Sequence, residues 1–428
     1  MQITIHRGID RIGGCITKIC TKHSAVLIDL GRILPEGDKA VDDELDTPEA
    51  IRNLCKDCDA VFYTHYHGDH IDLFGHVPEQ IPQYIGPVAK QVMLIKYESL
   101  AKKDKQKATH IPRLEQFHTY AVRQRIKVGE DIWITPYFVS HSAADAYMFL
   151  IEANGKRILH TGDFRGHGYL SKGLIPMLQK YIVPHGIDVL ICEGTMLNRK
   201  DKNIPRENEL KAKATELMRQ YKNVFILCSS TDMDRLATFH AANRQMHRRP
   251  FVCDAYQQKL LKLFSETAGA KSLMYMFNHN VIGSNESNTK LRDWMLREGF
   301  TMLVRRNKKY SHWVTSLLPQ LNPKETVLLY SMFRGYILPT HPAFSPATKA
   351  FVDMFPNSEY LHTSGHATTD TLAEVCRTVN PQTAIIPIHR EKNSDFAALV
   401  IGNELCSRIV TTSQNIDGIE IIINKEND

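Results

Sequence analysis

The stretch that decides the fold is DAVFYTHYHGDHID, residues Asp59–Asp72. An apolar run, Ala60–Tyr63, leads into HYHGDH at residues 65–70, which holds four metal-capable side chains within six residues. Side chains alternate along a strand, so His65 and His67 share one side, while Asp69 and His70 follow the tight turn that Gly68 allows. Burying several imidazoles with a carboxylate is costly without a cation. The stretch therefore predicts a strand that ends in a loop able to serve two metal ions.

Three later apolar strands end in further metal-capable residues. These segments are Ile132–His141, Arg157–Asp163 and Thr383–His389. Ligands gathered at the carboxyl ends of several strands are typical of sites in α/β folds, and the Asp163 carboxylate can bridge two cations. Each histidine taken alone is more often a surface or core residue. Together with residues 65–70, however, the set predicts one centre for two divalent ions.

Strand-like and helix-like segments alternate along the chain, which indicates a layered α/β protein. The apolar runs predict strands over Ala25–Leu30, Ala60–Tyr63, Ile132–Val139, Arg157–Leu159, Asp188–Ile191, Val224–Leu227, Thr326–Tyr330 and Thr383–Ile388. Helical spacing predicts helices over Pro87–Lys102, Glu207–Tyr221 and Thr371–Val379, the last capped by Asp370 or Thr369.

Composition and length indicate a folded globular protein. The chain has 428 residues, of which 43% are hydrophobic and 23% charged, enough for two or three domains. We find no signal-peptide pattern and no apolar run of about 18 residues, so we expect a cytoplasmic protein without a membrane partner. Nine scattered cysteines indicate reduced thiols. The pair Cys55 and Cys58 has no second pair to complete a zinc knuckle, which leaves it a weak redox or metal candidate.

Charge is distributed unevenly. Residues 204–349 hold 22 Lys and Arg against 11 Asp and Glu, whereas the rest of the chain holds 31 against 36. A basic segment between acidic flanks suits a polyanion-binding domain inserted into a metal-binding body, although surface charge without function is the plain alternative. We place the domain boundaries at 203/204 and 349/350.

At this point the chain resembles a known family. HYHGDH (65–70), HSAAD (141–145), TGDFR (161–165) and the strand with Asp29 resemble the ordered motifs of the metallo-β-lactamase fold. Glu193 in ICEGT, His366 in HTSGHA and His389 in IPIHRE resemble the three motifs of its β-CASP branch, with ribonuclease J the nearest family.

The resemblance runs from about Ile12 to His389 and implies a fold and a domain division. The expected fold is an α/β protein with a metallo-β-lactamase αββα sandwich and an inserted α/β β-CASP domain. Residues 1–203 would form the first part of the metallo-β-lactamase domain, 204–349 the basic insert, and 350–428 the completing part.

The resemblance also implies a role for each motif residue. His65, His67 and His141 would hold one ion, Asp69, His70 and His389 the other, and Asp163 would bridge them. Asp69 would orient the attacking hydroxide, Glu193 would support the site, and His366 would contact the scissile phosphate. A structural role for His366, held by Ser364, is the alternative. Two positions depart from the family pattern: Gly194 follows Glu193 where Ser is usual, and Arg390 follows His389 where Gly is usual.

Substrate contacts are expected in the basic segment. Ser229, Ser230 and Thr231 follow a predicted strand and precede a predicted helix, so they can form a phosphate nest, with Arg235 offsetting the charge of Asp232. An ordinary helix cap is the alternative. Ser364 and His366 would also contact substrate. The run Arg305–Trp313 mixes cations with aromatic rings, as single-strand binding surfaces do, although a solvated face explains it too.

These observations predict a two-metal-ion phosphodiesterase that cleaves single-stranded RNA with a metal-bridging hydroxide, as an exonuclease, an endonuclease or both. Zinc is the expected metal and manganese the alternative. A histidine at position 389 is typical of RNA-processing members of the branch. A DNA nuclease, a small-molecule metallohydrolase and a non-catalytic RNA-binding subunit stay open, as does assembly into a homo-oligomer.

Overall fold

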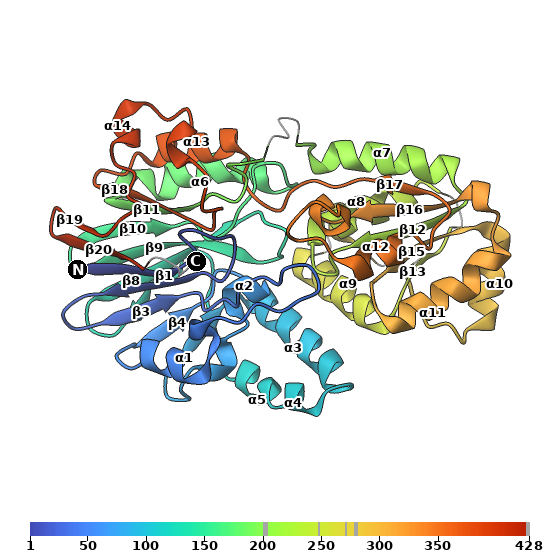
Figure 1. The fold of residues 1–428 in the computed structure, drawn as a ribbon, viewed down its shortest axis with the longest axis horizontal. Helices are drawn as coiled ribbons and strands as arrows, with labels where there is room; N and C mark the ends of the chain where they lie inside the picture. Colours follow the sequence, from blue (N-terminus) through green and yellow to red (C-terminus); the bar gives the residue numbers. More distant parts are fainter. Residues whose placement is uncertain (200–203, 247–248, 270–271, 278–280, 425–428) are drawn as a thin grey trace. The chain divides into compact units, whose positions relative to one another are not determined.

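The computed structural model describes residues 1–199, 204–246, 249–269, 272–277 and 281–424, which form two compact units (Figure 1). Unit 1 comprises Met1–Leu34, Val41–Asn203 and Gly365–Asp428, and unit 2 comprises Pro35–Ala40 and Ile204–Ser364. The division of the sequence at 203/204 and 349/350 stays a prediction, and position 349 lies inside helix α12 (Pro346–Val352) of unit 2.

Unit 1 contains two sheets. The first has the strand order β19 (Gln414–Ile416), β20 (Ile419–Ile423), β1 (Gln2–Arg7), β2 (Ile16–Cys20), β3 (Ala25–Ile28), β4 (Ala60–Phe62), β5 (Gln83–Ile85) and β6 (His118–Thr119). The second has the order β18 (Ala384–Ile388), β11 (Val189–Glu193), β10 (Lys156–His160), β9 (Ala146–Ala153), β8 (Ile132–Val139) and β7 (Ile126–Val128).

The two sheets pack face to face around a shared apolar core. Ile28 and Phe62 from the first sheet belong to the same buried cluster as Phe149 and Ile191 from the second. The other face of the second sheet packs against helices α6 (Leu174–Tyr181) and α13 (Thr369–Val379). Figure 1 shows α1 (Pro48–Leu54) and α3 (Pro87–Ala101) beside the first sheet. This layering confirms the αββα sandwich.

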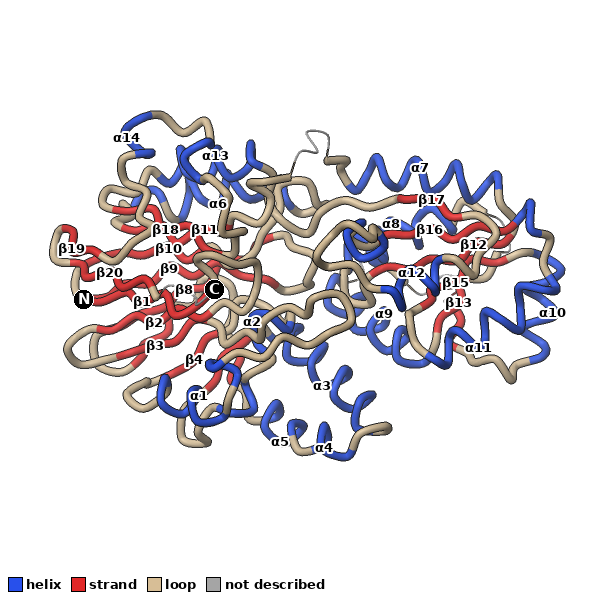
Figure 2. Tube along the Cα trace, in the orientation of Figure 1, coloured by secondary structure: helices blue, strands red, loops and turns tan. Residues whose placement is uncertain are grey.

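Shorter helices complete unit 1. They are α2 (Gly68–Ile71), α4 (Lys105–Ala108), α5 (His110–Glu115) and α14 (Asn403–Cys406) (Figure 2). None of the helices in the described ranges is long and apolar enough to cross a membrane.

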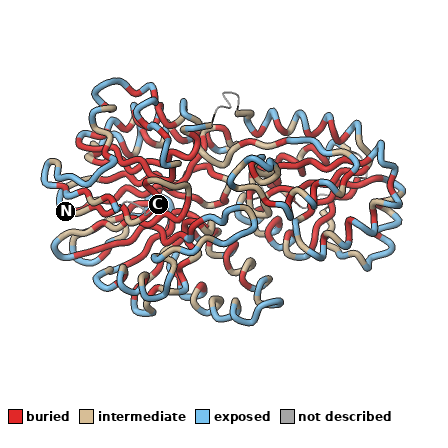
Figure 3. Tube along the Cα trace, viewed as in Figure 1, coloured by how far each residue is buried: buried red, intermediate tan, exposed pale blue. Residues whose placement is uncertain are grey.

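Unit 2 is built on one parallel sheet. Its order is β14 (Val281–Gly283), β13 (Phe251–Cys253), β15 (Phe300–Val304), β12 (Asn223–Cys228), β16 (Thr326–Ser331) and β17 (Ser358–Tyr360), with every neighbouring pair parallel. The helices of this unit are α7 (Glu207–Gln220), α8 (Met233–Asn243), α9 (Ala255–Ala268), α10 (Thr289–Glu298), α11 (Lys308–Leu317) and α12. Figure 3 shows the outer turns of α7 and α10 as exposed, and the four central strands β13, β15, β12 and β16 are buried.

The predicted elements are confirmed with small shifts at their ends. Strand β8 spans Ile132–Val139 as predicted, and helix α7 ends one residue earlier than predicted. The cap predicted for α13 is wrong. That helix begins at Thr369, and Thr368 caps it because its hydroxyl oxygen accepts a hydrogen bond from the Thr371 backbone N–H at 3.2 Å.

Candidate metal centre

The HYHGDH segment lies against the end of strand β3. Two backbone hydrogen bonds hold it there, Leu30 N to His70 O at 2.8 Å and Arg32 N to Gly68 O at 3.0 Å. Gly31 makes this approach feasible, because a Cβ at that position would lie 1.7 Å from Asp69 O. The loop between β4 and α2 is therefore fixed by the strand and glycine of the Asp29 motif.

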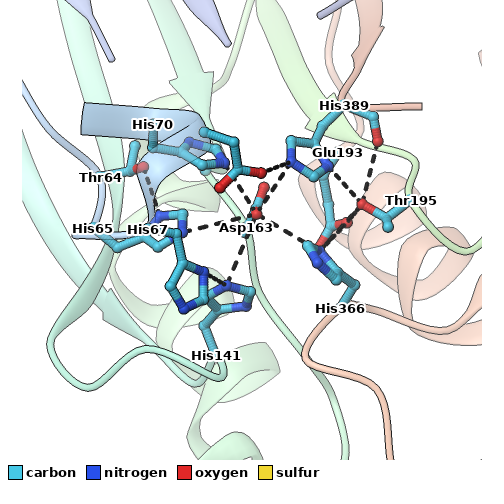
Figure 4. Close-up of polar contacts among 12 residues, drawn as sticks. Thr64, His65, His67, His70, His141, Asp163, Glu193, Thr195, His366 and His389 are labelled. Atoms are coloured by element: carbon cyan, nitrogen blue, oxygen red, sulfur yellow. Dashed lines mark hydrogen bonds and ion pairs between the residues drawn. The ribbon is translucent and has the colours of Figure 1, made fainter. Parts of the chain in front are cut away.

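Three histidines form one cluster of ligand atoms. One ring nitrogen each of His65, His67 and His141 lies within 4.8 Å of the other two. His141 Nε2 is 3.2 Å from His67 Nδ1, and Figure 4 shows the three rings converging from two different strand ends. The structure thus brings together the three residues predicted to hold one ion.

Asp163 is the point on which the wider site converges. Its Oδ2 atom lies 3.1 Å from His70 Nε2, 3.5 Å from His389 Nε2, 3.6 Å from His366 Nδ1, 3.8 Å from His141 Nε2 and 3.9 Å from His65 Nε2. The carboxylate is 3% exposed. One buried oxygen therefore faces five imidazoles, which is the position that a bridging ligand needs.

Asp69, His70 and His389 gather on the other side of Asp163. Asp69 Oδ2 lies 3.2 Å from His389 Nε2, and all three side chains are almost completely buried. His389 is held in the left-handed region, with φ +52°, as the chain leaves strand β18. The residues predicted to hold the second ion are thus also brought together.

Three of the ligand rings are held at the nitrogen that faces away from the centre. Thr64 Oγ1 lies 3.1 Å from His65 Nδ1, Asp29 Oδ2 lies 2.7 Å from His70 Nδ1, and Gly365 O accepts from His141 Nδ1 at 2.6 Å. Asp29 also accepts from the backbone N–H and hydroxyl of Thr64 at 2.7 and 2.8 Å. Such contacts fix ring orientation and the nitrogen presented to a metal.

Glu193 supports the site through a hydroxyl. Thr195 donates to Glu193 Oε2 at 2.7 Å, and its oxygen lies 2.7 Å from His389 Nδ1 (Figure 4). The same Glu193 oxygen lies 3.1 Å from His366 Nδ1. Glu193 therefore orients His366 directly and orients His389 through Thr195. The sequence did not predict this role of Thr195.

Most of the cluster has the protonation that suits a cation, but His70 does not: burial lowers its pKa, and the Asp163 and Asp29 carboxylates outweigh burial and hold it well above the usual value. Burial, with the neighbouring His70 and His67 adding to it, holds the pKa of His65 well below its usual value, and burial with His67 does the same for His141. Burial opposes ionisation of Asp163, but His389 and His70 outweigh it and hold its pKa well below the usual range. Neutral imidazoles and ionised carboxylates are the forms that bind metals.

His366 has the opposite character. Burial by itself lowers its pKa, but the Glu193 and Asp163 carboxylates outweigh this and raise it to about 9. An imidazolium is therefore expected at neutral pH beside the ligand cluster. Such a group can donate a proton or stabilise negative charge.

The donor set fits metal ions. Nε2 of His65 is buried and makes no hydrogen bond within the described residues, although its ring is held at Nδ1. A buried nitrogen aimed at carboxylates and other imidazoles is the environment of a metal ligand rather than of a core histidine. The clusters are compatible with metal binding by nitrogen and carboxylate ligands.

Of the predicted substrate contacts, His366 lies in unit 1 and the other five lie in unit 2. Ser229, Ser230 and Thr231 are partly exposed in the turn between β12 and α8, and Asp232 caps α8. Arg235 differs from the expectation, because its side chain is 1% exposed and is paired with Glu207 at 3.1 Å. Its guanidinium is buried inside unit 2 and is not presented to a substrate. Ser364 is partly exposed at the end of this unit.

The aromatic rings of the Arg305–Trp313 run do not form a surface for stacking. Tyr310 and Trp313 are 1% and 3% exposed and pack on each other in the core, with ring centroids 5.9 Å apart. Arg305 pairs with Asp254, and its guanidinium lies 4.5 Å from the Tyr256 ring. Helix periodicity carries the aromatic residues of this run inward.

Part of the chain is similar to known proteins. Residues 41–224 match the model of the beta-lactamase superfamily domain. Ribonuclease J of Helicobacter pylori, in strains 26695 and B128, is 29% identical over 174 residues, which are 39% of this chain. The matched part spans only 23% of those ribonucleases.

A solved structure shares the fold over nearly the whole chain. It is the crystal structure of a protein of unknown function from Enterococcus faecalis V583, with a TM-score of 0.69 and 19% identity, covering 94% of this chain and 96% of that one. The sandwich, the domain match and the His/Asp clusters together support assignment of unit 1 to the metallo-β-lactamase superfamily.

Proposed function

We propose that this protein is a metal-dependent phosphodiesterase that cleaves single-stranded RNA. The observation that carries the proposal is the Glu193–His366 pair, which sets the His366 ring 3.6 Å from the carboxylate at the middle of the ligand cluster. The partial similarity to ribonuclease J supports RNA as the substrate. The excess of Lys and Arg in residues 204–349 is favourable for a polyanion.

The metal ligands would be the seven residues of the cluster. His65, His67 and His141 would hold one ion, Asp69, His70 and His389 the other, and Asp163 would contact both. Two divalent ions supply an activated water and neutralise charge on the phosphate. Zinc suits these ligands, with manganese as the alternative.

The chain's own residues would position the substrate and move a proton. Nδ1 of His366 faces Glu193, so the proton offered to the leaving oxygen is the one at Nε2. Asp69 and Asp163 would orient the attacking water, whose oxygen bonds to phosphorus as the bond to the leaving oxygen breaks. Ser229, Ser230, Thr231 and Ser364 would contact the substrate backbone, whereas Arg235 would hold unit 2 together.

The first test is cleavage of 5′-labelled single-stranded RNA and the matching DNA by metal-loaded protein. We expect cleavage of RNA, with a product ladder that separates exonuclease from endonuclease action. Asp163→Asn should be inactive because the central carboxylate is lost. His185→Ala, which changes an exposed histidine outside the cluster, is the matched control and should retain activity.

Other outcomes of this assay would favour one of the alternative functions. Equal cleavage of DNA would favour a DNA nuclease. No cleavage by protein that holds two ions per chain would contradict the proposal and favour a small-molecule metallohydrolase. No cleavage together with no bound metal would favour a non-catalytic RNA-binding subunit.

A further inference from the structure

Cys15 lies in the metal centre, although neither its sequence context nor the family motifs mark it. Its sulfur and one ring nitrogen each of His70 and His389 lie within 4.8 Å of one another, and all three residues are buried. Ligands of one zinc ion lie about 2.0–2.3 Å from it, so atoms that share an ion reach separations of this order. The three atoms therefore have the spacing of a common ligand set.

The backbone fixes Cys15 in this position. Its N–H donates to Asp69 O at 3.0 Å, and its carbonyl accepts from Gly31 N at 3.1 Å. Gly8, in the same turn between β1 and β2, accepts from the backbone N–H of His389 at 2.5 Å. The turn is thus tied to both ligand segments, and the Cys15 position is set by the same contacts that set the cluster.

The two histidine rings are held at their other nitrogens. Nε2 of His70 is buried 3.1 Å from Asp163 Oδ2, while Nδ1 of the same ring is held by Asp29 at 2.7 Å. His389 is held in the same way, at Nδ1 by Thr195. Both rings are therefore oriented with Nε2 turned to the carboxylates of the centre, Asp163 for His70 and Asp69 for His389, and each ring has one nitrogen within 4.8 Å of the Cys15 sulfur.

We propose that Cys15 is a further ligand of the ion held by His70 and His389, and that its thiolate makes this position select zinc over manganese. The thiol loses its proton to solvent as the sulfur–metal bond forms. Thiolate is a soft ligand that favours zinc, whereas manganese favours carboxylate and water. The proposal rests on the metal centre of the proposed function and not on its substrate.

Cobalt substitution tests the ligand directly. Thiolate ligation gives Co²⁺ an intense near-ultraviolet charge-transfer band, which we expect in the protein loaded with two cobalt ions and not in Cys15→Ser. The double variant Cys55→Ser/Cys58→Ser removes the two most closely spaced cysteines of the sequence and should keep the band. Absence of the band from the unmodified protein, or its persistence in Cys15→Ser, would overturn the proposal.

Two further measurements keep the test decisive if Cys15→Ser folds poorly. X-ray absorption of the zinc-loaded, unmodified protein should show a sulfur scatterer at about 2.3 Å, and nitrogen and oxygen scatterers alone would contradict the proposal. In competition between zinc and manganese, Cys15→Ala should reduce the preference for zinc at least about tenfold, the scale of effect seen for groups around a metal.

The two proposals can fail separately. Protein that shows the sulfur ligand but cleaves no nucleic acid would contradict only the nuclease assignment. Protein that cleaves RNA without any sulfur signal would contradict only the role of Cys15.

Discussion

Thr195 illustrates how a single residue can connect the parts of the centre. Its hydroxyl bridges Glu193 and His389, and it is 5% exposed. A buried carboxylate that acts through a hydroxyl fixes the tautomer and orientation of the imidazole behind it. Thr195 is therefore a positioning residue, and its removal should lower metal affinity more than it lowers the rate of the chemical step.

Removing this hydroxyl should weaken one metal position. We expect Thr195→Val to lower the affinity of the ion held by His389 by about 10–100-fold, because the ring loses its partner at Nδ1. Transfer of metal to a chelator measures the effect. Thr195→Ser keeps the hydroxyl and is the matched control, so equal loss of affinity in both variants would argue against this role.

His366 should titrate unusually high in the metal-free protein. Its pKa is raised to about 9, and Glu193→Gln should move it down towards about 6.5, the ordinary value, by removing the largest opposing charge. Histidine NMR signals followed against pH measure both values. An unchanged pKa in Glu193→Gln would contradict the assigned pairing.

The raised pKa of His366 means that its protonated form stabilises the folded protein more at low pH than at high pH. Because the folded protein binds this proton more tightly than the unfolded chain, the contribution of His366 is complete below about pH 6.5. It is lost as the pH rises through about 9. Unfolding of the metal-free protein in urea across this window should show the decline, and Glu193→Gln should reduce it.

At the scale of elements, short apolar runs rich in β-branched residues were the easiest strands to predict. Strand β8 ends in the metal motif and has the expected bounds. Strand β9 is also buried on both faces, with alternate residues in different cores, but it was missed because its sequence AYMFLIEA contains only one β-branched residue, Ile151. The hairpin β19–β20 did carry a signal, Asp417-Gly418, with φ +50° and +76°.

The ends of helices α7 and α8 are joined by a buried ion pair. Arg235 contacts Glu207, the Ser331 hydroxyl and the Thr363 carbonyl, and Thr238 donates to Glu207 Oε2 at 2.7 Å. A sequence containing STDMDR suggests a cationic phosphate contact, but the neighbours that pair with Arg235 come from distant segments. Only the tertiary structure assigns it to the core.

Breaking this pair should destabilise unit 2. We expect Glu207→Leu to lower the free energy of unfolding of unit 2 by about 3–5 kcal/mol, because it leaves a buried guanidinium without its counter-charge. The double variant Glu207→Leu/Arg235→Met should recover most of the loss, since no uncompensated charge remains. Urea unfolding followed by tryptophan fluorescence, with Trp313 in the core of this unit, measures both. A double variant as unstable as the single one would contradict the explanation.

For the whole molecule, the two units have separate apolar cores. The clusters around Phe149 and around Leu159 lie in unit 1, and the cluster around Phe225 lies in unit 2. Strand β20 pairs in parallel with β1, so unit 1 is completed by both ends of the described chain. A ligand that binds only to folded unit 1 should therefore stabilise that unit selectively.

Metal removal should test this selectivity. At a free metal concentration about 1,000 times the dissociation constant, binding stabilises the folded state by about 4 kcal/mol, and a chelator should remove this contribution. We expect loss of hydrogen-exchange protection in β10, β11 and β18 and little change in β12 and β16. Equal loss in both units would show that they unfold as one.

The sequence by itself determined the class of the fold and predicted the histidines and aspartates that the structure brings together at the strand ends. It could do so because ligands at strand ends are encoded locally, by an apolar run followed by a short polar motif. The tertiary structure alone decided which nitrogen of each ring faces the centre, that Thr195 links Glu193 to His389, that Arg235 is buried and that Cys15 joins the cluster. The physical reason is that orientation and pairing depend on hydrogen bonds and packing between residues tens to hundreds of positions apart, which local periodicity does not record.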